Sequence, residues 1–172
     1  MAETWRRLAR LRVPLGFVAG ILVLWLARPT RGLLAAGTLV ALAGETIRVW
    51  AAGHLEKSRE VTRSGPYRWS RHPLYVGSAL MGVGVAIAGN SAVAAAAIGL
   101  YLGVTFTAAI RTEEAFLRAK FGEEYDDYCR GASRAPDRRF SLARAWRNRE
   151  YRAVLGMCAV FALLLLKAFF SL

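Results

Sequence analysis

Four long apolar stretches, separated by short charged segments, dominate the pattern of this chain. They are residues 13–27, 32–53, 74–110 and 153–172. A helix needs about 20 mostly apolar residues to cross a bilayer, because each residue adds about 1.5 Å to span a core of about 30 Å. The third stretch has 37 residues without a charge, which is too long for one span. The turn residues Gly89, Asn90 and Ser91 near its middle predict a tight hairpin between two helices.

The sequence thus predicts an all-α, polytopic integral membrane protein that forms a single domain over residues 1–172. Five transmembrane helices are expected at about residues 13–27, 32–53, 74–89, 91–110 and 153–172. The basic residues before the first span are also typical of a secretory signal peptide. Because residues 28–31 offer no small-x-small cleavage site, we expect the first helix to be retained.

Composition supports the membrane prediction, and charge predicts on which side of the membrane each terminus lies. Hydrophobic residues make up 55 % of the chain and its mean hydropathy is +0.30, whereas soluble domains typically reach about 45 to 50 %. The 24 Lys and Arg against 12 Asp and Glu would also suit a nucleic-acid binder. However, alternate polar segments hold four, five and eleven basic residues on one side against two and none on the other. The positive-inside rule therefore predicts a cytoplasmic N-terminus, an external C-terminus and no nucleic-acid partner.

The polar segment before the hairpin, residues 61–77, reads VTRSGPYRWSRHPLYVG. Gly65 and Pro66 are turn signals, and Pro73 suits the first turn of a helix. Its other notable residues are Tyr67, Arg68, Arg71, His72 and Tyr75. Arg and Tyr are ordinary anchors at a membrane surface, but a simple connector does not require this cluster. We therefore treat it as a candidate binding site.

The segment after the hairpin, residues 111–136, reads RTEEAFLRAKFGEEYDDYCRGASRAP. Its apolar residues have helical spacing, which predicts a helix that ends at Gly122. Glu113 and Glu114 lie where the fourth span leaves the bilayer, and we expect them to face the histidine-containing segment. The alternative is a solvated helix cap in which Glu114 pairs with Arg118.

Together the two segments resemble the isoprenylcysteine carboxyl methyltransferase family and the related phospholipid methyltransferases. The elements that carry this resemblance are RHPxYxG at residues 71–77 and EExxLxxxFGxxYxxY at residues 113–128, in this order and around a two-span hairpin. The resemblance implies an integral membrane methyltransferase that binds S-adenosylmethionine in a pocket on the cytosolic side. It also implies a lipophilic methyl acceptor that enters from the membrane lipid bilayer.

The resemblance further implies which residues bind the cofactor, within segments 61–77 and 111–136. The expected set is Gly65, Pro66, Tyr67, Arg71, His72, Tyr75, Glu113, Glu114, Tyr125 and Arg134. Independently of the resemblance, the chain has no GxGxxG motif after a strand, so a Rossmann cofactor domain is not expected. A pocket embedded in the membrane is consistent with that absence.

Methyl transfer from a sulfonium requires positioning and exclusion of water, but no metal and no covalent nucleophile. For a carboxylate acceptor, Arg71 or Arg111 is the candidate to hold the anion by bidentate contact. For an amine acceptor, which must lose a proton, Glu113 or Glu114 is the candidate base. These four are the predicted catalytic residues, and the choice between O- and N-methylation stays open.

Glu45 and Arg48 stand out because ionisable groups inside a membrane span are expensive and usually functional. Their spacing of three residues places them on one face of the second span. One interpretation is a self-neutralising pair near the inner boundary of the membrane, where Arg48 can extend toward water. The functional interpretation is that the two residues bind the acceptor substrate.

We expect this methyltransferase to lie in a prokaryotic inner membrane. Two other functions are alternatives to methyl transfer. Sterol reductases are similar around an RHPxY-like element and use NADPH, but their chains are usually longer. The element at Glu113 and Glu114 favours S-adenosylmethionine over NADPH as the bound cofactor. A non-enzymatic scaffold would instead use the basic loops to hold anionic lipid.

Overall fold

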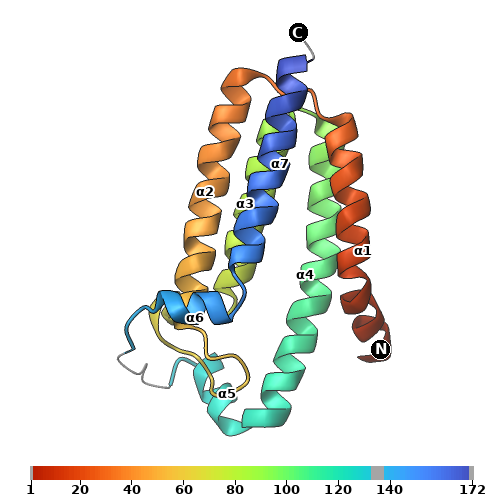
Figure 1. Cartoon of the computed structure of the whole chain (residues 1–172). Helices are drawn as coiled ribbons and strands as arrows, with labels where there is room; N and C mark the ends of the chain where they lie inside the picture. The colour runs from red at the N-terminus through yellow and green to blue at the C-terminus, as the bar shows by residue number, and fades with distance from the viewer. Residues whose placement is uncertain (1, 133–137, 171–172) are drawn as a thin grey trace.

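The structure is a computed structural model that describes residues 2–132 and 138–170, with side chains from residue 14 onward. Its elements are α1 (Ala2–Leu26), α2 (Arg31–His54), the 3-10 helix η1 (Gly65–Arg68), α3 (Pro73–Gly89), α4 (Ala92–Phe121), α5 (Glu123–Cys129), α6 (Leu142–Arg147) and α7 (Tyr151–Phe170). The long helices run side by side in one bundle, while α5 and α6 gather at one end of it (Figure 1). The all-α prediction is confirmed.

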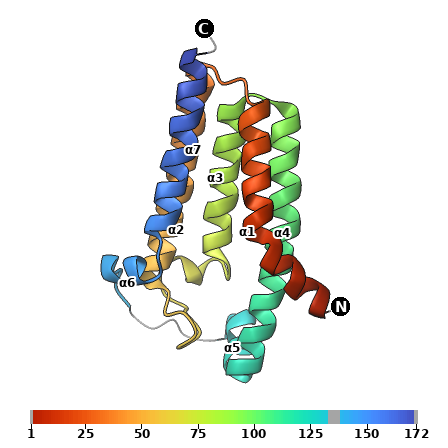
Figure 2. The ribbon, with the colours of Figure 1, turned by 45° about the vertical axis from the view of Figure 1, so that its right-hand side comes forward.

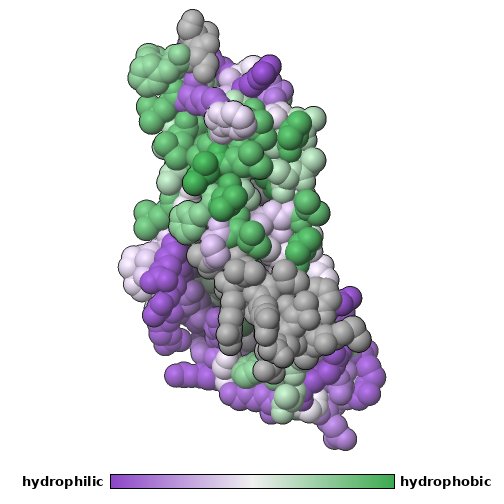
Figure 3. All heavy atoms as spheres, turned by 90° about the vertical axis from the view of Figure 1, so that its right-hand side faces the viewer, coloured by the Kyte–Doolittle hydropathy of each residue, from purple (hydrophilic) through white to green (hydrophobic). Residues whose placement is uncertain are grey.

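Three of the described helices are long and apolar enough to cross a membrane by length and composition, namely α2, α4 and α7. The helix α3 and the Pro14–Leu26 part of α1 are shorter apolar helices. Large apolar side chains face outward, and Trp25 and Phe170 are 76 % and 79 % exposed. Figure 3 shows an apolar band between two more hydrophilic ends. The chain is therefore an integral membrane protein, whereas the count of five spans stays a prediction.

Residues in the hairpin determine where α3 ends and where α4 begins. Asn90 adopts a left-handed φ of 47° and ends α3. The Ser91 hydroxyl then accepts a hydrogen bond of 3.3 Å from the backbone N–H of Ala94 and caps α4. The predicted end at Gly122 is also observed, with a φ of 51°. The fourth predicted span and the polar helix after it form one continuous helix of 30 residues, α4.

Glycine contacts hold α2 and α3 together as an antiparallel pair. Gly37 lies against Gly84, and Gly44 lies against Gly77. A Cβ added at Gly44 would lie 2.6 Å from the carbonyl oxygen of Gly77, which is closer than Cβ atoms approach other heavy atoms in proteins. Small residues permit this approach of two backbones, as they do between membrane helices generally. The contact also brings the polar end of α2 beside the start of α3.

The C-terminal helix α7 packs against the outside of α2 and α3. Its Leu164 is fully buried, in a cluster with Ala27, Leu34 and Ala88. Lys167 Nζ donates hydrogen bonds to two backbone carbonyls at the end of α1, at 2.7 and 2.8 Å. A cation at this position also interacts favourably with the negative end of the helix dipole. Figure 2 shows α7 beside α2, with its last turns at the end of the bundle away from α5.

The polar end of α2 is held by the segment between α5 and α7. Asn148 Nδ2 donates to the carbonyls of Ala52 and Leu55, at 2.9 Å each. The backbone N–H of Ser141 donates to the Gly53 carbonyl at 3.1 Å. A helix leaves its last carbonyls without partners in the helix, and these donors satisfy them. The end of α2 is thereby fixed against α6.

Candidate functional site

The two sequence elements singled out above lie beside each other at the polar end of the bundle. The Tyr75 hydroxyl on α3 donates a hydrogen bond of 3.1 Å to Glu113 Oε2 on α4. His72 Nε2 lies 3.1 Å from Glu114 Oε1, and Arg71 Nη1 lies 3.7 Å from the same oxygen. The structure thus brings together the arginine-histidine segment and the paired glutamates.

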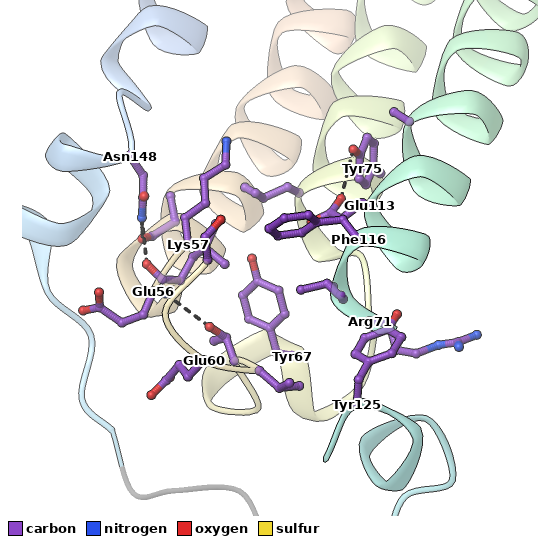
Figure 4. Close-up of a pocket in the computed structure, with 18 of the residues that line it drawn as sticks. Glu56, Lys57, Glu60, Tyr67, Arg71, Tyr75, Glu113, Phe116, Tyr125 and Asn148 are labelled. Carbon is purple, nitrogen blue, oxygen red and sulfur yellow. Dashed lines mark hydrogen bonds between the residues drawn. The ribbon is translucent and has the colours of Figure 1, made fainter. Parts of the chain in front are cut away.

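A cavity of about 940 Å³ opens beside this contact. Its walls come from the end of α2 and the segment after it, from η1, and from α3, α4 and α5 (Figure 4). Ligand pockets typically measure about 300 to 1,000 Å³, so this cavity can hold a nucleoside and part of a second molecule. The predicted site residues that line it are Arg48, Tyr67, Arg71, Tyr75, Glu113 and Tyr125.

The other predicted site residues lie outside the cavity lining. His72 and Glu114 stand behind the wall that Arg71 and Glu113 form. Arg111 is exposed on α4 and is not part of the lining. Arg134 lies outside the described residues.

Gly65 and Pro66 also lie outside the lining, and they shape the loop that carries Tyr67. Gly65 adopts a φ of 58° and packs against the His54 ring, so that an added Cβ would lie 2.7 Å from a ring carbon. His54 is buried, and its Nδ1 lies 3.0 Å from Ser64 Oγ. The glycine therefore serves the close packing of the loop on the end of α2.

The two adjacent glutamates have different surroundings. Glu114 Oε1 faces His72 and Arg71, and Arg118 Nη1 lies 3.8 Å from its other oxygen. This carboxylate therefore binds cations of the protein itself. Glu113 lines the cavity and accepts the hydrogen bond from Tyr75. It is the glutamate of the pair that a ligand in the cavity can reach.

Tyrosine hydroxyls supply neutral donors around the cavity. The Tyr67 side chain points into it from η1 (Figure 4). Burial raises the pKa of Tyr67 and Tyr125 well above the ordinary value, and it raises the pKa of Tyr128 to about 12. The Tyr128 hydroxyl donates to the backbone carbonyl of Tyr67 at 2.7 Å, which ties α5 to η1. At neutral pH all three hydroxyls keep their protons.

Arg71 is oriented from two sides. Its Nη1 donates to Cys129 Sγ on α5 at 3.4 Å, and it also faces Glu114. The hydrogen bond to Cys129 raises the pKa of the Arg71 guanidinium above its ordinary value. Arg71 is therefore a permanent positive charge at the edge of the cavity.

Two acidic residues that the sequence interpretation missed line the opposite wall. Glu56 accepts a hydrogen bond of 2.8 Å from Arg144 Nε, and this bond holds the pKa of Glu56 below its ordinary value. Glu60 accepts two hydrogen bonds from Arg138. Their partners lie 88 and 78 residues away, so no local spacing points to these pairs.

Arg48 also has a partner that the sequence interpretation missed. Its Nε lies 2.7 Å from Glu150 Oε1 but 3.9 Å from Glu45 Oε2. Its Nη1 donates to Ser78 Oγ and to the Leu74 carbonyl. The main ion pair is therefore between α2 and the residue before α7. Arg48 and Glu150 line the cavity, whereas Glu45 lines a separate, smaller pocket.

Comparison with known proteins identifies relatives for about half of the chain. The nickel-cobalt-cadmium resistance protein NccN of Alcaligenes xylosoxydans xylosoxydans is 36 % identical over 100 residues, covering 57 % of this chain and 46 % of that protein. A probable protein-S-isoprenylcysteine O-methyltransferase of Oryza sativa subsp. indica is 34 % identical over 104 residues, 54 % of each chain. The protein-S-isoprenylcysteine O-methyltransferase of Schizosaccharomyces pombe is 31 % identical over 86 residues, 50 % of this chain and 36 % of that one.

The chain spans about half the length of the curated relatives it matches, such as the resistance protein and the rice methyltransferase above. No solved structure matches it significantly. The sequence profile of the phospholipid methyltransferase family matches residues 32–124, which is more than half of the chain and contains both motif elements up to Glu124. The chain therefore belongs to the phospholipid methyltransferase family.

Proposed function

We propose that this protein transfers a methyl group from S-adenosylmethionine to a lipophilic acceptor that enters its cavity from the bilayer. The observation that carries the proposal is that Arg71, Tyr75 and Glu113, which belong to the two family elements, line the same cavity. Family membership supports methyl transfer, and the outward-facing apolar helices support an acceptor from lipid.

The residues around the cavity fit the chemical groups of S-adenosylmethionine. The Glu113 carboxylate suits a sulfonium or ammonium cation, and the Arg71 guanidinium suits a carboxylate. The aromatic rings of Phe116 and Tyr125 suit the adenine base. When bound, the cofactor supplies a methyl group that is already activated by the positive sulfur. The protein then has to orient both ligands and exclude water from between them.

Within this proposal the two glutamates act differently. Glu113 contacts the ligands, and Tyr75 fixes the direction of its carboxylate. Glu114 positions His72 and Arg71 from behind. Tyr67 is a hydrogen-bond donor to an oxygen or nitrogen inside the cavity, because its proton is retained. Arg111 is exposed and does not line the cavity, so we assign it no contact with the ligands.

The acceptor group is proposed to lie near Arg48 and Glu150. Both line the cavity, and Glu150 is only 6 % exposed. The start of α7 follows Glu150 directly, which places this ion pair at one edge of the apolar part of the bundle. A lipid head group that diffuses along the membrane reaches this depth. The basic residues of the polar segments support the orientation proposed from the sequence, in a prokaryotic inner membrane with a cytoplasmic N-terminus.

Calorimetric titration of the detergent-purified protein tests the cofactor. We expect binding of S-adenosylmethionine and none of NADPH, which a reductase of the sterol type would bind. Binding of NADPH alone would overturn the proposal. Incubation with methyl-labelled S-adenosylmethionine and a total lipid extract of the host then tests the reaction. A labelled ester or a labelled amine in the organic phase distinguishes O- from N-methylation.

A further inference from the structure

A second, smaller pocket lies on α2, outside the cavity described above. It has a volume of about 330 Å³ and is lined by Leu42, Glu45, Thr46, Val49, Trp50 and Phe140. The five residues from α2 share one face of the helix, since their spacings are three, four, seven and eight. Leu42, Trp50 and Phe140 are 47 %, 36 % and 46 % exposed, so the pocket is open on the outer surface of the bundle.

Glu45 lies in this pocket without a hydrogen-bond partner. Only 7 % of its side chain is exposed, and neither carboxylate oxygen accepts a hydrogen bond among the described residues. Arg48 is 3.9 Å away, but its Nε is already 2.7 Å from Glu150. The cluster thus has one cation between two carboxylates. A buried carboxylate without a hydrogen bond is costly, and Glu45 is the one of the two carboxylates that lies further from the Arg48 Nε.

The pocket lies where the apolar chains of a bilayer meet its head groups. The helix α7 begins at Tyr151 and has 20 residues, which gives it a length of about 30 Å, equal to the hydrocarbon core. Glu150 precedes it and pairs with Arg48, so both lie at the edge of this core. Glu45 is three residues earlier in α2, about 4.5 Å further in. A lipid head group moving along the membrane can therefore reach it.

We propose that this pocket binds the ammonium group of a membrane lipid. An ammonium group compensates the Glu45 carboxylate, whereas an anionic lipid has a phosphate but no cation to offer it. The Trp50 and Phe140 rings line the same pocket, and aromatic faces next to a negative charge attract alkylated ammonium groups. The other walls are mainly apolar and suit N-methyl groups. The site is separate from the proposed methyl-transfer cavity, because Glu45 does not line that cavity.

Fluorine NMR of the detergent-purified protein with 5-fluorotryptophan tests this site in the absence of any methyl donor. The Trp50 resonance is assigned by its loss in Trp50→Phe. We expect a saturable shift of this resonance with dihexanoyl phosphatidylcholine and none with dihexanoyl phosphatidylglycerol, which has the same chains. In Glu45→Gln the dissociation constant should rise about tenfold, as expected when one charge contact is lost.

Glu123→Gln is the matched control, because it removes the same charge from an exposed position on α5. It should bind phosphatidylcholine as the native protein does. Phe140→Leu, which leaves the carboxylate in place, should weaken binding severalfold through the lost ring. Equal shifts with both lipids, or unchanged affinity in Glu45→Gln, would overturn the proposal. Because the readout is binding near Trp50, it is independent of whether the cavity transfers methyl groups.

Discussion

The Tyr75 hydroxyl and the Glu113 carboxylate form a hydrogen bond of 3.1 Å between α3 and α4, although 38 residues separate them (Figure 4). The neighbouring residues His72 and Glu114 also contact each other, with 3.1 Å between His72 Nε2 and Glu114 Oε1, but neither lines the cavity. One glutamate is therefore available to a ligand, while the other is engaged by the protein. This difference leads to a measurable distinction between them.

Glu113→Gln is expected to weaken binding of S-adenosylmethionine more than binding of S-adenosylhomocysteine, which lacks the sulfonium charge. The expected loss of preference is about tenfold, as for one charge contact. Titration calorimetry with both ligands measures it. Glu114→Gln is the matched variant and should affect both ligands alike, because Glu114 acts through Arg71 and His72. An equal effect of Glu113→Gln on the two ligands would contradict the assignment.

Gly44→Ala is expected to lower the unfolding free energy by about 1 to 3 kcal/mol, the usual cost of overpacking. The added Cβ would lie 2.6 Å from the Gly77 carbonyl oxygen, so α2 and α3 must separate. Thermal unfolding in detergent checks this effect. Gly20→Ala is the control, because nothing lies within 4 Å of a Cβ added there, and its midpoint should not fall.

Lys167→Met is expected to reduce stability by about 1 to 2 kcal/mol, through two lost hydrogen bonds from a charged donor. These bonds join α7 to the end of α1 at Leu24 and Trp25. Measuring the unfolding midpoint in detergent tests the effect, with Arg31→Gln as a control that removes a charge from an exposed residue at the same end. A midpoint as high as that of the control would show that α7 is held by apolar packing alone.

The Glu56 pair with Arg144 predicts a loss of stability in acid. The hydrogen bond from Arg144 holds the pKa of Glu56 below its ordinary value of 4.5. Its stabilisation is therefore complete above that ordinary value and is lost as the pH falls through the lower, folded-state pKa. Unfolding midpoints between about pH 6 and pH 3 should fall less steeply in Glu56→Gln, which starts lower at pH 6. Parallel curves would contradict the prediction.

Much of this fold could be predicted because lipid imposes simple rules on the sequence. Apolar length indicated the long helices, and the turn at Asn90 and the helix end at Gly122 follow from residues that accept left-handed backbone. The short helices α5 and α6 were not predicted. Six or seven residues carry too little periodicity, and α6 depends on contacts with the end of α2, such as Arg144 with the Gly53 carbonyl at 2.5 Å.

The candidate site was predicted where its residues are neighbours in a motif, as with Arg71 and Tyr75. It was missed where the partners meet only through the fold. Glu150 illustrates this, because it follows a polar segment and nothing nearby in sequence marks it as the partner of Arg48, 2.7 Å away. The pairing of Glu45 with Arg48 was suggested by helical spacing, yet packing of α7 against α2 supplies a better partner.

The uninterrupted length of α4 has a consequence for how ligands would leave the cavity. Its 30 residues extend about 45 Å, so the final third of the rod projects beyond a core of about 30 Å. Glu113 lies about 32 Å from the first residue of the rod, at the crossing point. Under the proposed function, the spent nucleoside would depart into water while the methylated lipid would depart sideways into the bilayer. The two products would then leave through different phases, and neither release would obstruct the other.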